Sequence, residues 1–308
     1  MTTQTLRTRR LGDGGPEVTV VGLGTNNFGP RIDFEQARSV VDAALEEGIT
    51  LFDTADVYGE GASEEFIGRA LEGRRDRVLI ATKFGKPMTG GPNLARGSRA
   101  YIRWAVERSL RRLRTDVIDV YQMHEPDERT PIEETLSALH ELVQEGLIRY
   151  IGSSNYSARQ IEAADRVARE GGLTRFVSAQ NEYSLLQRAA EDALLPVCER
   201  LGIGMLPYFP LASGLLTGKY RRGERAREGR LAAREISDDR WQSVEALQRF
   251  AEERGVSLLD VAIGGLAAMR PVVSVIAGAT KPEQVRANAS AGAWEPTEDD
   301  LAELKALR

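Results

Sequence analysis

A regular alternation of short apolar runs with amphipathic helical stretches, beginning near residue 19, most constrains the fold of this chain. The helical stretches carry apolar residues every three to four positions, whereas the apolar runs are short and continuous. Eight runs fit strands, at residues 18–25, 49–54, 77–83, 117–124, 148–155, 176–183, 203–210 and 272–279. Helices are predicted at 34–48, 63–73, 98–113, 131–146, 190–202 and 282–291, with Ser63 as the N-cap of the second.

Strands that alternate with helices form right-handed βαβ units and therefore a parallel sheet. Eight such units fit most simply into a closed (β/α)8 TIM barrel, because continuously apolar strands suit burial on both faces. We therefore predict an α/β fold with a single barrel domain over residues 1–308. Residues 6–18 contain a Gly-Gly-Pro turn between short runs, which predicts a β-hairpin that plugs the bottom of the barrel.

The alternative architecture is an open doubly wound sheet with a dinucleotide-binding fingerprint after its first strand. The segment "GLGTNNFG" has Gly22 and Gly24 but places Asn27 where the third glycine belongs, and no helix follows at once. The sequence therefore favours the barrel.

Composition limits the partners and the compartment. The net charge of −5 is mild and both signs are interspersed, which argues against nucleic acid or an anionic membrane. No apolar span is long enough to cross a bilayer, the N-terminus lacks a secretory pattern, and Cys198 is the single cysteine, so a cytoplasmic protein without an internal disulfide is expected. The arginine-rich segment 219–230 fits either a solvated loop or a phosphate-binding loop.

Polar side chains follow the strands at the edge where barrels carry their chemistry. The second predicted strand ends at Asp53, with Tyr58 soon after; the third ends at Lys83 and the fourth at His124. Any one of them has a structural explanation, but a carboxylate, a phenol, an ammonium and an imidazole at one rim indicate proton transfer.

The residue types suggest which reaction this is. A lysine ammonium near a tyrosine favours the phenolate and lowers the pKa of the phenol from about 10, so that it becomes a usable acid. A carboxylate would keep the lysine charged, and a histidine could position a substrate oxygen. This arrangement suits a carbonyl whose oxygen receives a proton while its carbon receives hydride.

The remaining rim fits a nicotinamide nucleotide. Ser154, Asn155 and Gln180 could hold a carboxamide, and Tyr208 offers a face for ring stacking. The loop 210–220, with Lys219, could bind a pyrophosphate, and the helix after Thr280 a further phosphate, although the loop also fits a plain surface turn. No zinc-site spacing and no G-x-S-x-G elbow is present; His140 fits a helix flank and Cys198 the core.

Several motifs are recognisable together and in order along nearly the whole chain: "LFDTADVYGEGASEEFIGRAL", "VLIATK", "VIDVYQMHEPD", "IRYIGSSN", "AQNEYSLL", "GLLTGKY" and "VIAGATKPEQVRAN". With these motifs the chain resembles the aldo-keto reductase superfamily, and within it the bacterial branch that is similar to potassium-channel β-subunits. The resemblance implies a TIM barrel that reduces aldehydes or ketones with NADPH and has no Rossmann domain.

The resemblance also assigns residues. It implies a catalytic tetrad in which Tyr58 is the general acid, Lys83 lowers its pKa, Asp53 pairs with Lys83, and His124 orients the carbonyl. Asp56 matches no tetrad position and is expected to shape the loop. The expected cofactor residues are Gly24, Thr25, Ser154, Asn155, Gln180, Tyr208, Pro210, Leu211, Ser213, Gly214, Lys219, Gly278, Thr280, Gln284 and Asn288, with Asn26 expected to contact substrate.

The chain departs from the family pattern at three positions. Phe209 and Ala212 replace the serine and glycine of "YSPLG", which removes a hydroxyl near the phosphates. Gln284 stands where the mammalian branch has an arginine for the 2′-phosphate, so NADPH preference is the less certain part of the cofactor assignment. Lys281 or an arginine of residues 221–230 could replace that arginine.

Two other functions remain open. One is a regulatory subunit in which bound nucleotide informs a partner; channel-subunit relatives tend to lack histidine at the position of His124, so its presence favours the enzyme. The other is a Schiff-base lyase with Lys83 as nucleophile, which would leave Asn155, Gln180 and Tyr208 without a role. The sequence names neither substrate nor oligomeric state, and substrate choice is expected to lie in residues 26–28, 86–98 and 219–237.

Overall fold

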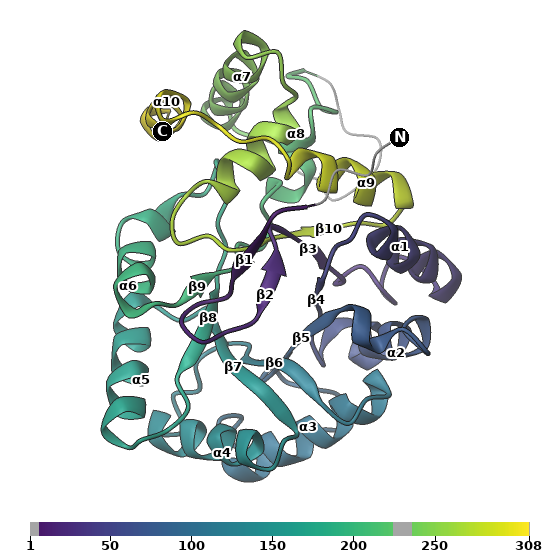
Figure 1. The fold of residues 1–308 in the computed structure, drawn as a ribbon, viewed down its shortest axis with the longest axis vertical. Coiled ribbons are helices and arrows are strands. Elements are labelled where there is room, and N and C mark those ends of the chain that lie inside the picture. Colours follow the sequence, from purple (N-terminus) through teal and green to yellow (C-terminus); the bar gives the residue numbers. More distant parts are fainter. Residues whose placement is uncertain (1–5, 224–235, 308) are drawn as a thin grey trace.

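The computed structural model describes residues 6–223 and 236–307, and within them eight parallel strands form one sheet (Figure 1). Neighbouring strands in the sheet follow the order β10-β3-β4-β5-β6-β7-β8-β9. The two outer strands are joined by backbone hydrogen bonds from Val273 N to Met205 O and from Ile276 N to Pro207 O, each 3.0 Å. The sheet is therefore the (β/α)8 barrel that the sequence predicts. Its strands are β3 (Val21–Gly24), β4 (Leu51–Asp53), β5 (Leu79–Phe84), β6 (Ile118–Met123), β7 (Ile148–Ser154), β8 (Phe176–Gln180), β9 (Gly204–Met205) and β10 (Val275–Gly278).

Helices surround the strands as an outer ring, seen in Figure 1 from α1 round to α6. Most begin at residues whose side chains accept a hydrogen bond from the first turn, such as Asp33, Ser98 and Ser157. The longer helices are α1 (Phe34–Glu46), α2 (Ala62–Ala70), α3 (Arg99–Leu113), α4 (Ile132–Gln144), α5 (Ala158–Glu170), α6 (Leu194–Leu201), α7 (Asp238–Glu253), α9 (Pro282–Ala291) and α10 (Glu298–Ala306). Short turns of helix are α8 (Leu258–Asp260), η1 (Tyr58–Gly61), η2 (Arg75–Arg77), η3 (Ala189–Glu191), η4 (Ala212–Thr217) and η5 (Val261–Gly265).

The predicted N-terminal hairpin is present. Strands β1 (Thr8–Arg10) and β2 (Glu17–Thr19) pair antiparallel, and Figure 1 shows them lying across the middle of the barrel. Leu11 in the turn and Val18 in β2 are fully buried in the apolar cluster that fills this end of the barrel. Arg9 donates to Ala267 O and, at 2.7 Å, to Val272 O, so the hairpin is also tied to the segment that enters β10.

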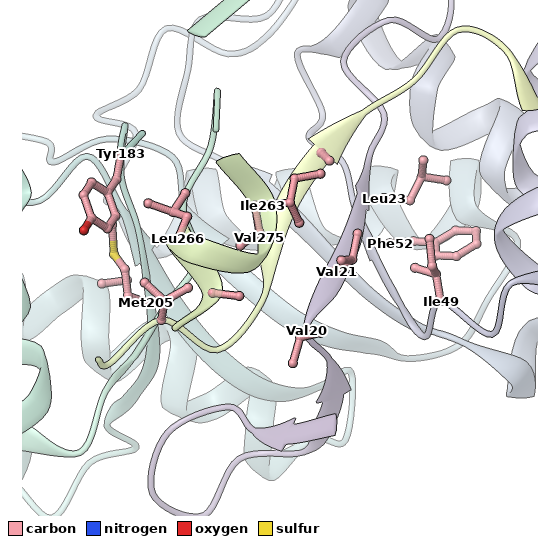
Figure 2. Packing of buried hydrophobic residues seen from close by; sticks show 14 of the residues in the cluster. Val20, Val21, Leu23, Ile49, Phe52, Tyr183, Met205, Ile263, Leu266 and Val275 are labelled. Atoms are coloured by element: carbon pink, nitrogen blue, oxygen red, sulfur yellow. The ribbon is translucent and has the colours of Figure 1, made fainter. Parts of the chain in front are cut away.

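The core has two layers because each strand is buried on both faces. One set of side chains fills the barrel: Leu11, Val18, Leu51, Ala81, Val120, Val177, Leu206, Val273 and Ile276. The larger set lies in the surrounding apolar layer that includes the helices; Figure 2 labels Val21, Phe52, Val275 and Ile263 among its members. No helix in the described part of the chain is long and apolar enough to cross a membrane.

Several predicted boundaries were wrong. Ser63 is not an N-cap: α2 begins at Ala62, and the Ser63 hydroxyl is buried against Thr25 and Thr54. The predicted strand 18–25 is divided between β2 and β3, and the predicted helix 190–202 becomes η3 and α6. The helices α5, α7 and α10 were not among the predicted ranges. The single-domain assignment over 1–308 stays a prediction.

Candidate functional site

A cavity of about 540 Å³ opens at the carboxyl ends of the strands, within the range typical of small-molecule and cofactor sites. Its wall includes residues at the end of each of the eight strands or in the loop that follows it. Three of the four expected tetrad residues line it (Asp53, Tyr58 and His124), as does Asn26. So do all fifteen expected cofactor residues, namely Gly24, Thr25, Ser154, Asn155, Gln180, Tyr208, Pro210, Leu211, Ser213, Gly214, Lys219, Gly278, Thr280, Gln284 and Asn288.

Lys83 lies beneath this wall, completely buried, and its ammonium is paired with Asp53. Because β4 and β5 are neighbours, their side chains meet: Lys83 Nζ is 2.9 Å from Asp53 Oδ1, 2.8 Å from Oδ2 and 2.8 Å from Thr54 O. Burial alone would lower the pKa of Lys83, but Asp53 and then Tyr58 outweigh it and the pKa is raised. The lysine is therefore a permanent cation beneath the cavity.

Tyr58 is held next to that cation by the loop after β4. The loop is fixed to β5 by a hydrogen bond of 3.0 Å from Asp56 N to Lys83 O, and it turns at Gly59 and Glu60, both with positive φ. Lys83 Nζ lies 3.4 Å from the Tyr58 hydroxyl and 5.1 Å from the centre of its ring. An ammonium this close favours the phenolate, so the hydroxyl is placed to give up a proton.

His124 follows β6 and meets Tyr58 edge to face, with ring centres 5.8 Å apart. Burial, followed by the positive charges of Lys83 and Lys86, lowers the pKa of His124 to about 2. The imidazole is therefore neutral at physiological pH. Its Nδ1 is buried and has no hydrogen-bond partner in the described structure, so a neutral ring faces Tyr58 as a hydrogen-bonding group rather than a proton source.

The expected carboxamide residues form a connected network. Tyr208 donates to Asn155 Oδ1 at 2.8 Å, and the Asn155 amide donates to Ser154 Oγ at 3.1 Å and His124 O at 2.9 Å. The backbone carbonyl of Gln180 accepts from Asn155 N at 3.0 Å, and its side chain donates to Asp53 Oδ1 of the buried ion pair at 2.7 Å. Donors and acceptors on several strands are thus fixed in position before any ligand binds.

The two loops that are expected to bind the cofactor phosphates follow β9 and β10. The loop after β9 contains four residues with positive φ, namely Phe209 and the consecutive Ala212, Ser213 and Gly214, which turn the chain tightly. After β10, Gln284 accepts hydrogen bonds from the amide and hydroxyl of Thr280 at the start of α9. Lys281 is not part of the cavity wall. Arg222 pairs with Asp238, and residues 224–230 lie outside the described residues.

Other wall residues were not predicted individually. They include two cations, Arg31 and Lys86, and the residues Thr217, Tyr220, Leu259, Ile276, Glu283 and Ala287. Asn27, Lys86 and Tyr220 fall in the three segments that were predicted to determine substrate choice, and all three line the cavity. Phe28, from the first of these segments, is instead buried in the core. Arg31 carried no signal in the sequence beyond its position six residues after the expected Thr25.

Comparisons with known proteins agree with this geometry. Residues 20–308 match the model of the aldo/keto reductase family. A probable voltage-gated potassium channel subunit beta of Arabidopsis thaliana is 37% identical over 92% of this chain and 90% of that protein. The L-glyceraldehyde 3-phosphate reductase of Escherichia coli (strain K12) is 35% identical over 92% and 86%. The holo form of aldo-keto reductase AKR11C1 from Bacillus halodurans superposes with a TM-score of 0.85 at 33% identity, covering 98% of this chain and 96% of the other.

Proposed function

Since this chain belongs to the aldo/keto reductase family and is an NAD(P)H-dependent oxidoreductase, we propose that it reduces aldehydes or ketones to alcohols with NADPH. Tyr58 is the proposed general acid. The observation that carries the proposal is the position of the Tyr58 hydroxyl 3.4 Å from a buried ammonium that Asp53 keeps charged. Tyr58 lines a cavity whose volume of about 540 Å³ is in the range of small-molecule and cofactor sites, and the ammonium lies beneath its wall.

The donor set fits a nicotinamide nucleotide. The side chains of Ser154, Asn155 and Gln180 lie in one wall of the cavity and match an amide, which both donates and accepts hydrogen bonds. Tyr208 adds an aromatic surface in the same wall, and Lys219 adds a cation for phosphate. When bound, the reduced cofactor supplies the hydride. The preference for NADPH over NADH is part of the proposal and follows from the family resemblance of the segment with Thr280, Gln284 and Asn288, in which Gln284 supplies no positive charge for the 2′-phosphate.

The chain's own residues handle the proton. Tyr58 donates its hydroxyl proton to the carbonyl oxygen as that oxygen gains negative charge, and Lys83 stabilises the phenolate that remains. Asp53 holds the ammonium by both carboxylate oxygens. His124, being neutral, can donate a hydrogen bond that orients the carbonyl oxygen toward Tyr58.

A regulatory role is the second candidate, favoured by the similarity to plant proteins named as probable potassium channel β-subunits. His124, in the cavity wall beside Tyr58, supports the enzyme instead. The proposed reaction needs a small-molecule substrate and no nucleic acid or membrane partner, and a cytoplasmic location is proposed with it.

The test is a titration of the purified protein with NADPH and, separately, NADH, followed by quenching of its tryptophan fluorescence. Wild type is compared with Tyr58→Phe and with Tyr150→Phe, which removes a phenol outside the cavity wall. We expect Tyr58→Phe to bind NADPH as wild type does but to lose about 10²- to 10³-fold in kcat for 4-nitrobenzaldehyde. Tyr150→Phe should keep both properties.

Three other outcomes would each change the conclusion. Absence of binding to either nucleotide would exclude the reductase and the regulatory subunit together. Binding without measurable turnover in wild type would favour the regulatory subunit. Loss of nucleotide binding in Tyr58→Phe would make Tyr58 a cofactor ligand rather than the acid.

A further inference from the structure

Two cations stand on either side of Tyr58 in the cavity wall. Arg31 lies in the loop after β3, Tyr58 in the loop after β4 and Lys86 just after β5, and these three strands are consecutive in the sheet. The loops are also packed together. A Cβ on Gly29 would lie 2.7 Å from the Cβ of Ala62, and one on Gly59 would lie 3.0 Å from Pro30 Cδ, so the turn carrying Arg31 lies directly against the Tyr58 loop.

Lys86 is close to His124, which lines the cavity beside Tyr58. Its charge contributes to the lowered pKa of His124, after burial and Lys83. The preceding residue, Gly85, lies against the His124 backbone, since a Cβ placed there would be 3.8 Å from His124 N. The two cations thus bracket the site where a carbonyl oxygen would meet Tyr58 and His124.

The charges of these cations are not cancelled locally. Arg31 is exposed and has no ion pair among the described residues, and Lys86 reaches Glu125 only at 3.9 Å. Glu125 also faces Arg96 at 3.6 Å, so one carboxylate serves two cations. Among the described residues, three other charged side chains line the cavity: Asp53, Lys219 and Glu283. Asp53 is already paired with Lys83. Lys219 and Glu283 lie in or beside the segments proposed to bind the cofactor.

The positive charges of Arg31 and Lys86 attract an anionic group of a substrate. They do not interfere with the reaction at its uncharged carbonyl group. From this geometry we infer that the preferred substrates are aldehydes bearing a carboxylate or a phosphate, whose anionic group is bound by Arg31 and Lys86. The inference rests on the proposed reductase function and deepens it. Arg31 and Lys86 act on substrate binding, so their contribution belongs in KM and in kcat/KM rather than in proton transfer.

The experiment compares, at saturating NADPH, pairs of substrates of which one bears an anionic group and the other does not. The first pair is 4-carboxybenzaldehyde and methyl 4-formylbenzoate, and the second is glyceraldehyde 3-phosphate and glyceraldehyde. The measured quantity is the ratio of kcat/KM, charged over neutral, in each pair. A cofactor effect changes both members of a pair equally, so it leaves the ratio unchanged. The two pairs separate a carboxylate ligand from a phosphate ligand.

The variants are Arg31→Gln, Lys86→Gln and the double variant, with Lys305→Gln as the matched control. Lys305 is an exposed cation of α10 outside the cavity wall, so its loss changes net charge by the same amount. We expect wild type to prefer the charged member of at least one pair. Each single variant should lower that ratio about fivefold and the double variant about twentyfold, mainly through KM. Raising the salt concentration should shrink the wild-type preference.

A ratio that stays constant in the variants, or that falls equally in Lys305→Gln, would overturn the inference. An equal loss of kcat/KM for both substrates of a pair would make Arg31 or Lys86 a cofactor ligand. That result would also overturn the inference. Binding is measured separately, by calorimetry of 4-carboxybenzyl alcohol against its neutral methyl ester on the NADP⁺ complex. If no aldehyde is reduced but the charged alcohol binds better and the variants remove that preference, the reductase fails and the anion site stands.

Discussion

At the scale of single residues, Asp56 is a carboxylic acid that the fold keeps from water. It is buried, and neither carboxylate oxygen makes a hydrogen bond of good geometry with a described residue, although the Val57 backbone lies nearby. Burial, and then the charge of Glu64, raises its pKa well above the ordinary value, against the opposing charges of Arg112 and Lys83. Its expected role in shaping the Tyr58 loop stays a prediction, but its proton has a measurable consequence.

Asp56 should make the protein less stable as the pH rises. The folded state keeps a proton that the unfolded chain releases above a pH of about 3.9, so the folded state binds more protons and loses stability until its own pKa is passed. Asp56→Asn removes this cost. We expect a melting temperature about 2 to 4 °C above wild type at pH 8, with the difference vanishing near pH 4.

Thermal unfolding of both proteins from pH 4 to pH 8 measures this difference. Asp116→Asn is the control, because Asp116 is exposed and forms no ion pair among the described residues. A difference that does not change with pH, or a less stable Asp56→Asn at pH 8, would show that folding does not raise the pKa of Asp56.

At the scale of elements, the hairpin β1–β2 is a structural plug with a specific apolar contact. Leu11 in its turn is completely buried within the barrel. We expect Leu11→Ala to lower the free energy of unfolding by about 2 to 5 kcal/mol, because it leaves a cavity in a closed core. Urea unfolding followed by circular dichroism measures the loss. Leu94→Ala, at a side chain that is 40% exposed, should change it by less than about 0.5 kcal/mol.

The elements show what sequence periodicity can and cannot predict. The alternation of strands and helices was sufficient for the barrel, because each βα unit repeats the same pattern of burial. Ser63 was misassigned because a serine before an acidic turn reads as an N-cap, while its hydroxyl is taken by Thr25 and Thr54 from neighbouring strands. These tertiary contacts of the Ser63 hydroxyl, which compete with helix capping, cannot be read from the local sequence. The helix α7 was missed because no apolar strand directly precedes it.

The sequence also predicts some features of the candidate site and not others. Residues at strand ends, such as Asp53 and His124, could be predicted because the barrel fixes which edge they share. The sequence could not show that Lys83 is completely buried or that His124 is neutral, because both depend on packing from several strands. Arg31 was missed since a single arginine in a loop has no periodicity. The roles of the predicted residues stay predictions.

At the scale of the whole molecule, the barrel is least continuous where β9 meets β10. Strand β9 has only two residues, whereas β6 has six and β7 has seven. The segments proposed to bind the cofactor follow β9 and β10, so a bound nucleotide would contact both sides of this junction. We expect the amides of Val273 and Ile276 to exchange hydrogen faster than those of β6, and NADP⁺ to slow them at least about tenfold.

Hydrogen exchange followed by mass spectrometry, with and without NADP⁺, measures this effect. The amides of Tyr121 and Gln122 in β6 are the internal control. Equal slowing of both sets would mean that the nucleotide stabilises the molecule globally, without a specific effect on the junction.

The same junction is held at its opposite end by Arg9, whose guanidinium donates to Val272 O and Ala267 O. The attachment by Arg9 is part of the chain and permanent, whereas the proposed attachment by a bound nucleotide would be present only while the nucleotide is bound. Cellular proteases attack the part of a protein that opens first. The half-life of this protein in a cell should therefore rise and fall with the concentration of its coenzyme. At an unchanged rate of synthesis, a cell with little nicotinamide nucleotide would degrade the protein sooner than a cell with much of it.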